Sequence, residues 1–316
     1  MPNRRALVAA LALGLAVAAV PLGAFAQENA EGKLPVVASF SILGDFVRQV
    51  GGDRVSLTTL VGSDGDAHVY SPTPADAKAM AAAKLVLVNG LHFEGWLPRL
   101  VKSSGTKATL AEATKGITPL EADDHDGNGK GGHAHAHGHD DPHAWQSVAN
   151  AKIYVANIRD ALSAADPAGK ASYEVNATAY LAELDALEGE VKAAVTRIPA
   201  ERRKAITTHD AFGYFVKAYG IAFVAPQRVS TEAEASAKDV ARIIRQVKAQ
   251  KIPAVFLENV TNPRLVEQIA RESGAKVGGR LYSDALSAES GPAGTYIRMM
   301  KHNISEIEKA LTAGPA

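Results

Sequence analysis

The chain contains no cysteine, and this absence removes several classes of protein at once. Without thiols there can be no disulfide framework, no thiolate metal site and no lipid attached through a thioether. Aromatic residues make up only 6% of the 316 residues, and 34 acidic side chains balance 34 basic ones. A neutral chain offers no general attraction for nucleic acid or an anionic membrane. Any transition metal would have to be held by imidazoles and carboxylates.

Long apolar runs are also missing, with one exception at the N-terminus. Two arginines precede an apolar stretch over 6–20, and an Ala-Phe-Ala sequence at 24–26 offers the small residues of a signal-peptidase site. A membrane anchor needs about 20 apolar residues, and the stretch over 6–20 is shorter and is interrupted by Pro21. We therefore expect residues 1–26 to be a cleaved secretory signal. Removal of the two arginines leaves 32 basic against 34 acidic side chains.

Strand and helix patterns alternate along the rest of the chain, which predicts an α/β fold with parallel sheets. Its length favours two lobes. Strands are expected at 36–40, 55–61, 85–88, 205–207, 221–224 and 254–257, and helices at 42–50, 74–83, 212–219, 235–250 and 295–311. We place the N-terminal lobe at 27–165, a connecting helix at 166–198 and the C-terminal lobe at 199–316.

The connecting segment is rich in good helix formers, with apolar residues recurring at helical spacing from Tyr173 to Val191. A helix of thirty residues would be roughly 45 Å long and could join the lobes stiffly. Such a rod predicts small hinge motions rather than wide closure. A helical hairpin broken at Gly189 is the alternative.

Histidine is concentrated in one stretch that is also rich in Asp and Gly. Six of the ten histidines lie there: His125, His133, His135, His137, His139 and His143. Imidazole is a common ligand of zinc and related metals, so this composition indicates that the chain handles a transition metal. The loop over 123–140 could instead be a solvated spacer, because it has little apolar surface to bury.

Candidate ligands also follow the predicted strands. His68 lies in the loop after 55–61, His209 follows 205–207, and Asp284 follows an apolar segment ending at 281–282, while His143 ends the histidine-rich loop. In open parallel sheets, ligands bind beyond the carboxyl ends of the strands. We therefore expect two candidate ligands from each lobe to meet in the cleft between them.

These residues lie in four motifs that resemble those of a known family. The motifs are Gly-Asp-Ala-His-Val-Tyr-Ser-Pro-Thr-Pro at 65–74, Asp-Pro-His-Ala-Trp at 141–145, His-Asp-Ala-Phe-Gly-Tyr-Phe at 209–215 and Tyr-Ser-Asp at 282–284. In order and spacing they resemble the metal-site motifs of the cluster A-I solute-binding proteins, the periplasmic zinc/manganese receptors of ABC transporters. Asn-Gly-Leu at 89–91, Glu94, Trp96 and the long helix add to the resemblance. Ala67 and the Gln-Ser pair at 146–147 depart from the usual Pro and Leu-Asp, but remove no donor atom.

The resemblance implies a metal site made of His68, His143, His209 and Asp284. Three imidazoles and one carboxylate suit Zn²⁺, whereas Mn²⁺ prefers more oxygen ligands. Manganese-directed relatives often carry a carboxylate in place of His209. The resemblance thus predicts a periplasmic high-affinity zinc receptor, with a manganese or mixed receptor as the alternative.

The expected partners are a membrane permease with its ATPase and a periplasmic metallochaperone, and we expect a monomer. The loop histidines His125, His133, His135, His137 and His139 would form an auxiliary capture site of low affinity. Glu258 and Asp210 follow strands where carboxylates could orient imidazoles. His92 and His302 are interpreted as ordinary surface or packing residues, with a place in the lining of the cleft as the alternative for His92.

Two other classes of function stay open at this point. A zinc hydrolase would keep an open coordination position with a general base beside it, a role that Asp210 or Glu258 could take. However, the sequence contains no His-Glu-x-x-His motif, no Gly-x-Ser-x-Gly elbow and no phosphate-binding Gly loop. An adhesin or histidine-rich metal buffer would bind most of its metal in the loop and none in the cleft.

Overall fold

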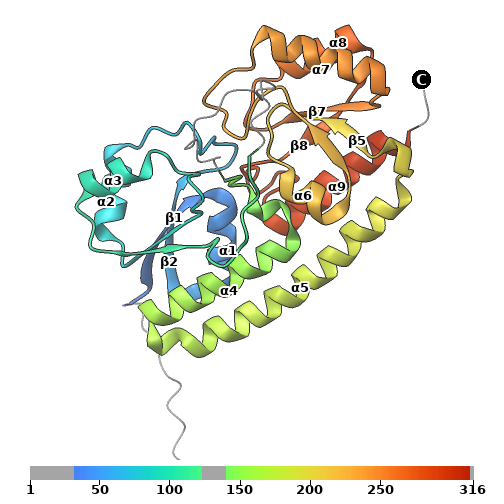
Figure 1. Ribbon diagram of the computed structural model, residues 1–316. Helices are drawn as coiled ribbons and strands as arrows, with labels where there is room; N and C mark the ends of the chain where they lie inside the picture. The colour runs from blue at the N-terminus through green and yellow to red at the C-terminus, as the bar shows by residue number, and fades with distance from the viewer. Residues whose placement is uncertain (1–31, 123–139, 314–316) are drawn as a thin grey trace, which may run out of the picture. The chain divides into compact units, whose positions relative to one another are not determined.

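The computed structural model describes residues 32–122 and 140–313. The expected signal at 1–26 and the loop histidines at 125, 133, 135, 137 and 139 lie outside the described residues, so their predicted roles stay predictions. From Lys33 onward the chain forms one compact unit that contains two parallel sheets flanked by helices (Figure 1). Among the described residues, no helix is both long and apolar enough to cross a membrane.

The N-terminal sheet has the strand order β2-β1-β3-β4, and all its pairings are parallel. Its strands are β1 (Leu34–Phe40), β2 (Val55–Val61), β3 (Leu85–Val88) and β4 (Thr109–Glu112). The accompanying helices are α1 (Ser41–Gly51), α2 (Pro74–Ala82), α3 (Leu97–Ser104) and α4 (Val148–Ala165). The three predicted strands and the two predicted helices are confirmed, whereas β4 and α3 were not predicted.

The C-terminal sheet repeats this plan with the parallel order β6-β5-β7-β8. Its strands are β5 (Lys204–Ile206), β6 (Ala222–Val224), β7 (Ala254–Glu258) and β8 (Lys276–Leu281). The helices are α6 (Gly213–Tyr219), α7 (Ala237–Gln250), α8 (Arg264–Ser273) and α9 (Tyr296–Thr312). The same strand order in both sheets places equivalent loops at equivalent positions.

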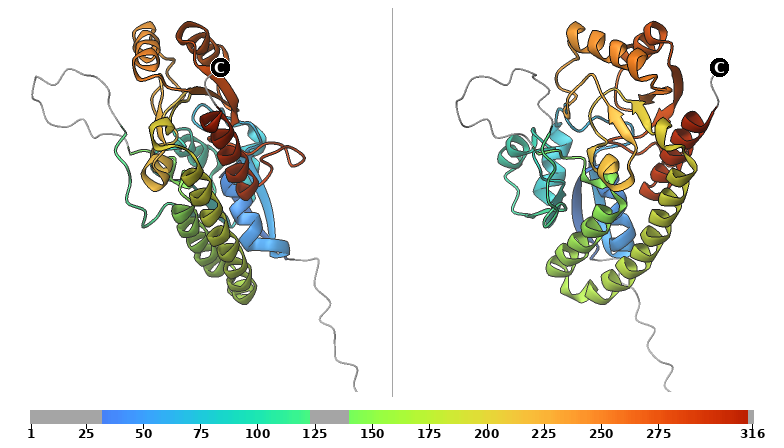
Figure 2. Two further views of the ribbon diagram at one scale, coloured as in Figure 1. Left: turned by 90° about the vertical axis from the view of Figure 1, so that its right-hand side faces the viewer. Right: turned by 45° about the vertical axis from the view of Figure 1, so that its right-hand side comes forward.

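One helix, α5 (Lys170–Arg197), runs from one lobe to the other. It packs against α1 and α4 of the first lobe and against α6 and α9 of the second, and the views in Figures 1 and 2 agree on this path. The helix continues through Gly189, so the broken-hairpin alternative is wrong. With 28 residues it is about 42 Å long, close to the predicted length.

The core explains why the lobes pack firmly. One apolar cluster extends through both lobes from Leu34 to Leu311, and it includes the buried face of α5. A second cluster lies between the C-terminal sheet and the helices α7 and α8. The joining of both lobes in one core supports a stiff scaffold beneath the cleft.

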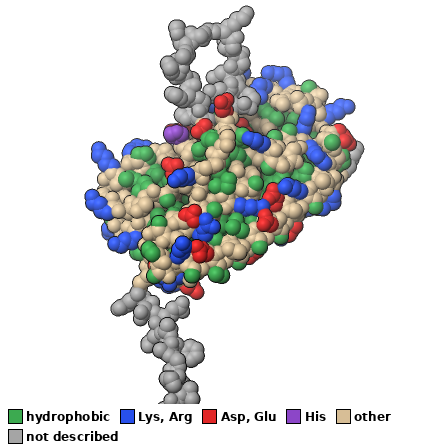
Figure 3. Space-filling model, turned by 60° about the horizontal axis from the view of Figure 1, so that its bottom comes forward, with side chains coloured by type: hydrophobic (Ala, Val, Ile, Leu, Met, Phe, Trp, Pro, Cys, Tyr) green, Lys and Arg blue, Asp and Glu red, His purple; other side chains and the backbone are tan. Residues whose placement is uncertain are grey.

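Charged side chains of both signs cover the exposed surface of the helices. In the face shown in Figure 3, basic and acidic groups are interspersed and neither sign gathers into a patch. Cross-helix ion pairs fit this picture: Lys152 lies 2.6 Å from Glu188, and Lys301 lies 2.9 Å from Glu190. Exposed pairs of this kind contribute little stability, so the core is what holds the lobes together.

Candidate metal site

Four loops bring His68, His143, His209 and Asp284 together between the lobes. One donor atom of each side chain lies within 4.8 Å of the others. His68 comes from the loop between β2 and α2, and His143 precedes the short 3₁₀ turn Ala144–Gln146 before α4. His209 follows β5 and Asp284 follows β8. Each lobe thus contributes two side chains, as the sequence predicted.

The four side chains point their acceptor atoms at a common point. The Nε2 atoms of His68 and His143 are 3.2 Å apart. The Oδ2 atom of Asp284 lies 3.1 Å from Nε2 of His209 and 3.3 Å from Nε2 of His68. His143, His209 and Asp284 are completely buried, and the His68 side chain keeps only 5% of its surface exposed. The cluster is therefore nearly closed to water.

Carboxylates fix the outward nitrogens of two of the rings. Nδ1 of His143 lies 2.8 Å from Oδ1 of Asp141, and Nδ1 of His209 lies 2.6 Å from Oε2 of Glu258. The second contact is short but its angle departs from that of a good hydrogen bond. A carboxylate can only accept, so it places the ring proton on Nδ1 and leaves the lone pair of Nε2 facing the centre of the cluster.

When neither a proton nor a metal ion is bound, the centre of the cluster contains only acceptor atoms. Imidazole lone pairs face one another and a carboxylate, and Oδ1 of Asp284 is buried without a hydrogen-bond partner. Buried acceptors that face only acceptors are costly unless a cation lies between them. Three nitrogens and one carboxylate oxygen are the donor set of a four-coordinate divalent metal. The residues present therefore fit a bound metal ion.

Proton affinities in the cluster reflect the same crowding of negative charge. Burial lowers the pKa of His143, but Asp284 and Asp141 outweigh burial and raise that pKa to about 9. The pKa of His209 is also raised, because Glu258 and Asp284 outweigh its burial. Burial acts to raise the pKa of Asp284, yet the nearby imidazoles hold it well below the usual value. Of the three imidazoles, only that of His68 has a lowered pKa, caused mainly by burial.

Two aspartates shape the loops of the N-terminal lobe in the same way. Oδ1 of Asp66 accepts the backbone N–H of His68 at 2.9 Å, and Oδ1 of Asp141 accepts that of His143 at 2.9 Å. Sequence reasoning assigned no role to either aspartate. The signal that could have found them is the repeated Asp-x-His spacing, since an Asp side chain readily binds the backbone N–H two residues on.

The departures from the family motifs at Ala67 and Gln146 take part in hydrogen bonds to backbone carbonyls and supply no atom to the metal cluster. The indole of Trp96 donates to the carbonyl of Ala67 at 2.7 Å, which fixes the loop just before His68. The amide of Gln146 and the indole of Trp145 both donate to the carbonyl of Ser283 at 2.8 Å. Gln146 thus helps to tie the segment that carries His143 to the segment that carries Asp284.

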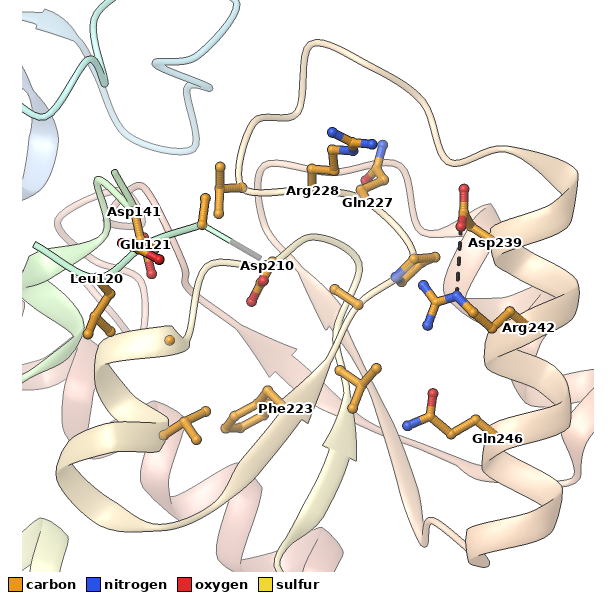
Figure 4. A pocket seen from close by; sticks show the side chains of 17 residues that line it. Leu120, Glu121, Asp141, Asp210, Phe223, Gln227, Arg228, Asp239, Arg242 and Gln246 are labelled. Atoms are coloured by element: carbon orange, nitrogen blue, oxygen red, sulfur yellow. Dashed lines mark ion pairs between the residues drawn. The ribbon is translucent and has the colours of Figure 1, made fainter. Parts of the chain in front are cut away.

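The two carboxylates proposed to orient imidazoles differ in their places. Glu258 does contact His209, and it also accepts the backbone N–H groups of Thr208 and His209 at 2.6 and 3.0 Å. Asp210 instead lines a hollow of about 540 Å³ that Asp141 also reaches (Figure 4). None of the four clustered side chains lines this hollow. Nε2 of His302 donates to the carbonyl of Arg280, 2.9 Å away in the C-terminal lobe, and His302 takes no part in the cluster.

Two parallel-sheet lobes that are joined by one long helix and close on three imidazoles and a carboxylate define a metal-binding protein of the two-lobed receptor class. The chain belongs to the family described as zinc-uptake complex component A, periplasmic, whose sequence profile matches residues 36–310.

Several known proteins are similar to this chain over most of its length. The manganese-binding lipoprotein MntA of Halalkalibacterium halodurans is 36% identical, with 90% of this chain and 91% of the relative covered. The periplasmic zinc binding protein TroA from Treponema pallidum has a TM-score of 0.81 at 30% identity, with 89% of this chain and 100% of that one covered. The Mn-bound periplasmic metal binding protein from Candidatus Liberibacter asiaticus has a TM-score of 0.78 at 31% identity, with 88% and 100% covered.

Proposed function

We propose that this protein is the metal receptor of an ABC transporter and that His68, His143, His209 and Asp284 bind the metal that it carries. The observation that carries the proposal is the buried set of acceptor atoms within 4.8 Å of one another. The carboxylates of Asp141 and Glu258 keep two ring protons on the outer side, which leaves nitrogen lone pairs for an ion. In this proposal the metal is cargo, bound for delivery.

The proposed cargo is a first-row divalent ion, with manganese as well as zinc among the ions accepted. Of the three similar proteins described above, one is named as manganese-binding, one is described in a Mn-bound structure and one is named as zinc-binding. The donor set argues in the other direction, because three nitrogens and one oxygen favour zinc over manganese. A mixed Mn/Zn receptor accommodates both observations better than the zinc-only receptor expected from the donors alone.

The proposed role in transport implies protein partners for this receptor. A receptor of this family would bind metal in the periplasm and pass it to a membrane permease driven by an ATPase, and a metallochaperone could load the site. The support is the family match over residues 36–310 together with the periplasmic descriptions of similar proteins. A hydrolase is less well supported, since Glu258, one suggested base, already holds His209 and two backbone N–H groups.

Competitive binding of Zn²⁺ and Mn²⁺ to the purified protein tests the proposal, with His209→Ala as the informative variant. Loss of one of four donors should weaken binding of either ion by roughly a hundredfold or more, since even outer partners of metal ligands contribute 10–100-fold. His302→Ala is the matched control, because His302 lies outside the cluster. Equal binding by wild type and His209→Ala would move the metal elsewhere in the chain and reject this site.

A further inference from the structure

Of the four clustered side chains, His68 lies nearest to solvent. It keeps 5% of its side-chain surface exposed, whereas the other three are completely buried. Its neighbour Val69 is half exposed. A bound ion would therefore leave most easily on the side of His68, and it could do so only if the loop between β2 and α2 moved. Whatever holds this loop in place should control the rate of metal release.

Three hydrogen bonds tie this loop of the N-terminal lobe to the opposite lobe. The backbone N–H of Asp64 donates to the carbonyl of Leu286 at 2.8 Å. The amide of Asn259 donates to Oδ1 of Asp64 at 3.0 Å, and the hydroxyl of Thr231 donates to Oδ2 of Asp66 at 2.6 Å. The loop that carries His68 is thus anchored across the cleft.

Only one of these ties acts directly on His68. Asp66 accepts the Thr231 hydroxyl on Oδ2 and the backbone N–H of His68 on Oδ1. The two oxygens of one carboxylate therefore join the C-terminal lobe to the backbone of His68. We call the Thr231–Asp66–His68 connection the clasp. Asn259 is anchored separately through the carbonyl of Ala285, so its bond to Asp64 is not specific to His68.

The surroundings of the clasp allow it to open. Asp66 and Thr231 line a hollow of about 370 Å³ that also reaches Thr208, the residue before His209. Both side chains are partly exposed, so water can take over their hydrogen-bonding groups when they part. A charge-assisted bond at the edge of water is strong enough to slow opening, yet can break without leaving an unpaired buried group.

We propose that Thr231 is a positioning residue that holds Asp66, and through it His68, in the closed arrangement and thereby slows metal release. The inference rests on the proposed function of the cluster as the metal site. Thr231 touches none of the four side chains through any contact that the structure gives, so its effect passes through Asp66. Removal of the hydroxyl should speed dissociation of the metal and leave the coordinating atoms unchanged.

Dissociation of Zn²⁺ and of Mn²⁺ into excess chelator, followed by stopped flow on the full protein, tests the clasp. Thr231→Val keeps the branched shape but loses the donor, and we expect it to release metal about tenfold faster, the size of one hydrogen bond to a charged group. Thr231→Ser keeps the hydroxyl and should release metal at nearly the wild-type rate. Thr178→Val is the matched control, because the Thr178 hydroxyl bonds only within α5 at 2.7 Å from the Glu174 carbonyl.

The melting temperature of the metal-free protein separates positioning from a general structural role. If Thr231 acts by positioning alone, metal-free Thr231→Val should have the same melting temperature as the metal-free wild type. Faster release of the metal should be its only defect. Release at the wild-type rate would overturn the proposal, and so would equally fast release by Thr231→Val and Thr231→Ser. If the wild-type protein bound neither Zn²⁺ nor Mn²⁺, the proposed function would be refuted, and the proposal about the clasp would be refuted with it.

Discussion

At the scale of single residues, the site depends on which ring nitrogen carries the proton. His143 and His209 each face a carboxylate on one side and the cluster on the other. The carboxylate selects the tautomer in which Nε2 can donate its lone pair to a metal. Asp141 and Glu258 therefore matter for binding although neither reaches the centre of the cluster.

Substitution Glu258→Gln should weaken metal binding by about 10- to 100-fold. The amide keeps the size of the side chain but can turn an N–H toward Nδ1 of His209, which favours the tautomer with the proton on Nε2. Competition with a chelating indicator measures the change. Glu190→Gln is the control, because Glu190 pairs with Lys301 on the surface at 2.9 Å. Unchanged affinity in Glu258→Gln would mean that packing alone orients the ring of His209.

At the scale of secondary-structure elements, α5 determines how the two lobes are connected. Its buried residues lie along one face, from Tyr173 to Val195, and they join the core shared by both lobes. Gly189 lies on the exposed side within the helix, and a Cβ atom built there would meet nothing within 4 Å. The helix therefore stays unbroken at its weakest residue because tertiary packing outweighs local propensity.

Substitution Gly189→Ala should stabilise the protein by roughly 0.5–1 kcal/mol, since glycine within a helix has more conformational freedom to lose than alanine. Thermal unfolding should show an increase of about 2 °C. Gly278→Ala offers the contrast, because a Cβ atom there would lie 2.4 Å from the Phe256 ring and should destabilise β8. If Gly189→Ala lowered the melting temperature, the helix would be distorted at that position.

Most of the elements predicted from the sequence carry clear periodicity or a continuous apolar run, although the amphipathic helices α3 and α8 were missed. The buried strands β1 and β3 and the amphipathic helices α1, α7 and α9 fall within a residue or two of their expected bounds. In contrast, β4 is mostly exposed and β8 contains two glycines, so neither shows the alternation of a half-buried strand. Their pairing depends on neighbouring strands, which a local pattern does not contain.

The placement of the candidate site was predicted more completely than the sheets that support it. The clustered residues His68, His209 and Asp284 were placed because they follow predicted strands, whose carboxyl ends meet at one edge. His143 does not follow a strand, and the resemblance of its motif to the family completed the set. The outer contacts were harder to foresee. Glu258 was suggested along with Asp210, but only the distances show that Glu258 contacts His209. Asp141, two residues before His143, was missed, because its role depends on a turn rather than on spacing between elements.

At the scale of the whole molecule, metal binding would connect the two lobes and compete with protons. Below about pH 9 the metal-free cluster holds a proton on His143, and the pKa of His209 is also raised by Glu258 and Asp284. The stability that the His143 proton gives the metal-free fold is fully present below the unfolded His pKa near 6.5 and is lost as pH rises through about 9. A metal ion must displace the same protons, so its apparent affinity should change in the opposite direction.

We therefore expect the increase in melting temperature caused by saturating Zn²⁺ or Mn²⁺ to grow from pH 6 to pH 9. The metal-free protein loses proton-linked stability over this range while metal binding tightens, and the stabilisation by a ligand follows its affinity. Thermal melts with metal and with EDTA at each pH measure the two curves. A constant difference between the curves across this range would show that metal binding displaces no protons.

The unbroken helix α5 has a consequence for how the transporter could recognise a loaded receptor. A connector of 28 residues that packs on both lobes resists bending, so the lobes cannot signal occupancy by a large swing. The difference between the metal-bound and the metal-free receptor must then be local. The two states would differ in which of the loops over the cleft are ordered. The permease proposed as partner would then recognise the loaded receptor by the ordered loops at its surface, because the overall shape of the receptor would be the same with and without metal.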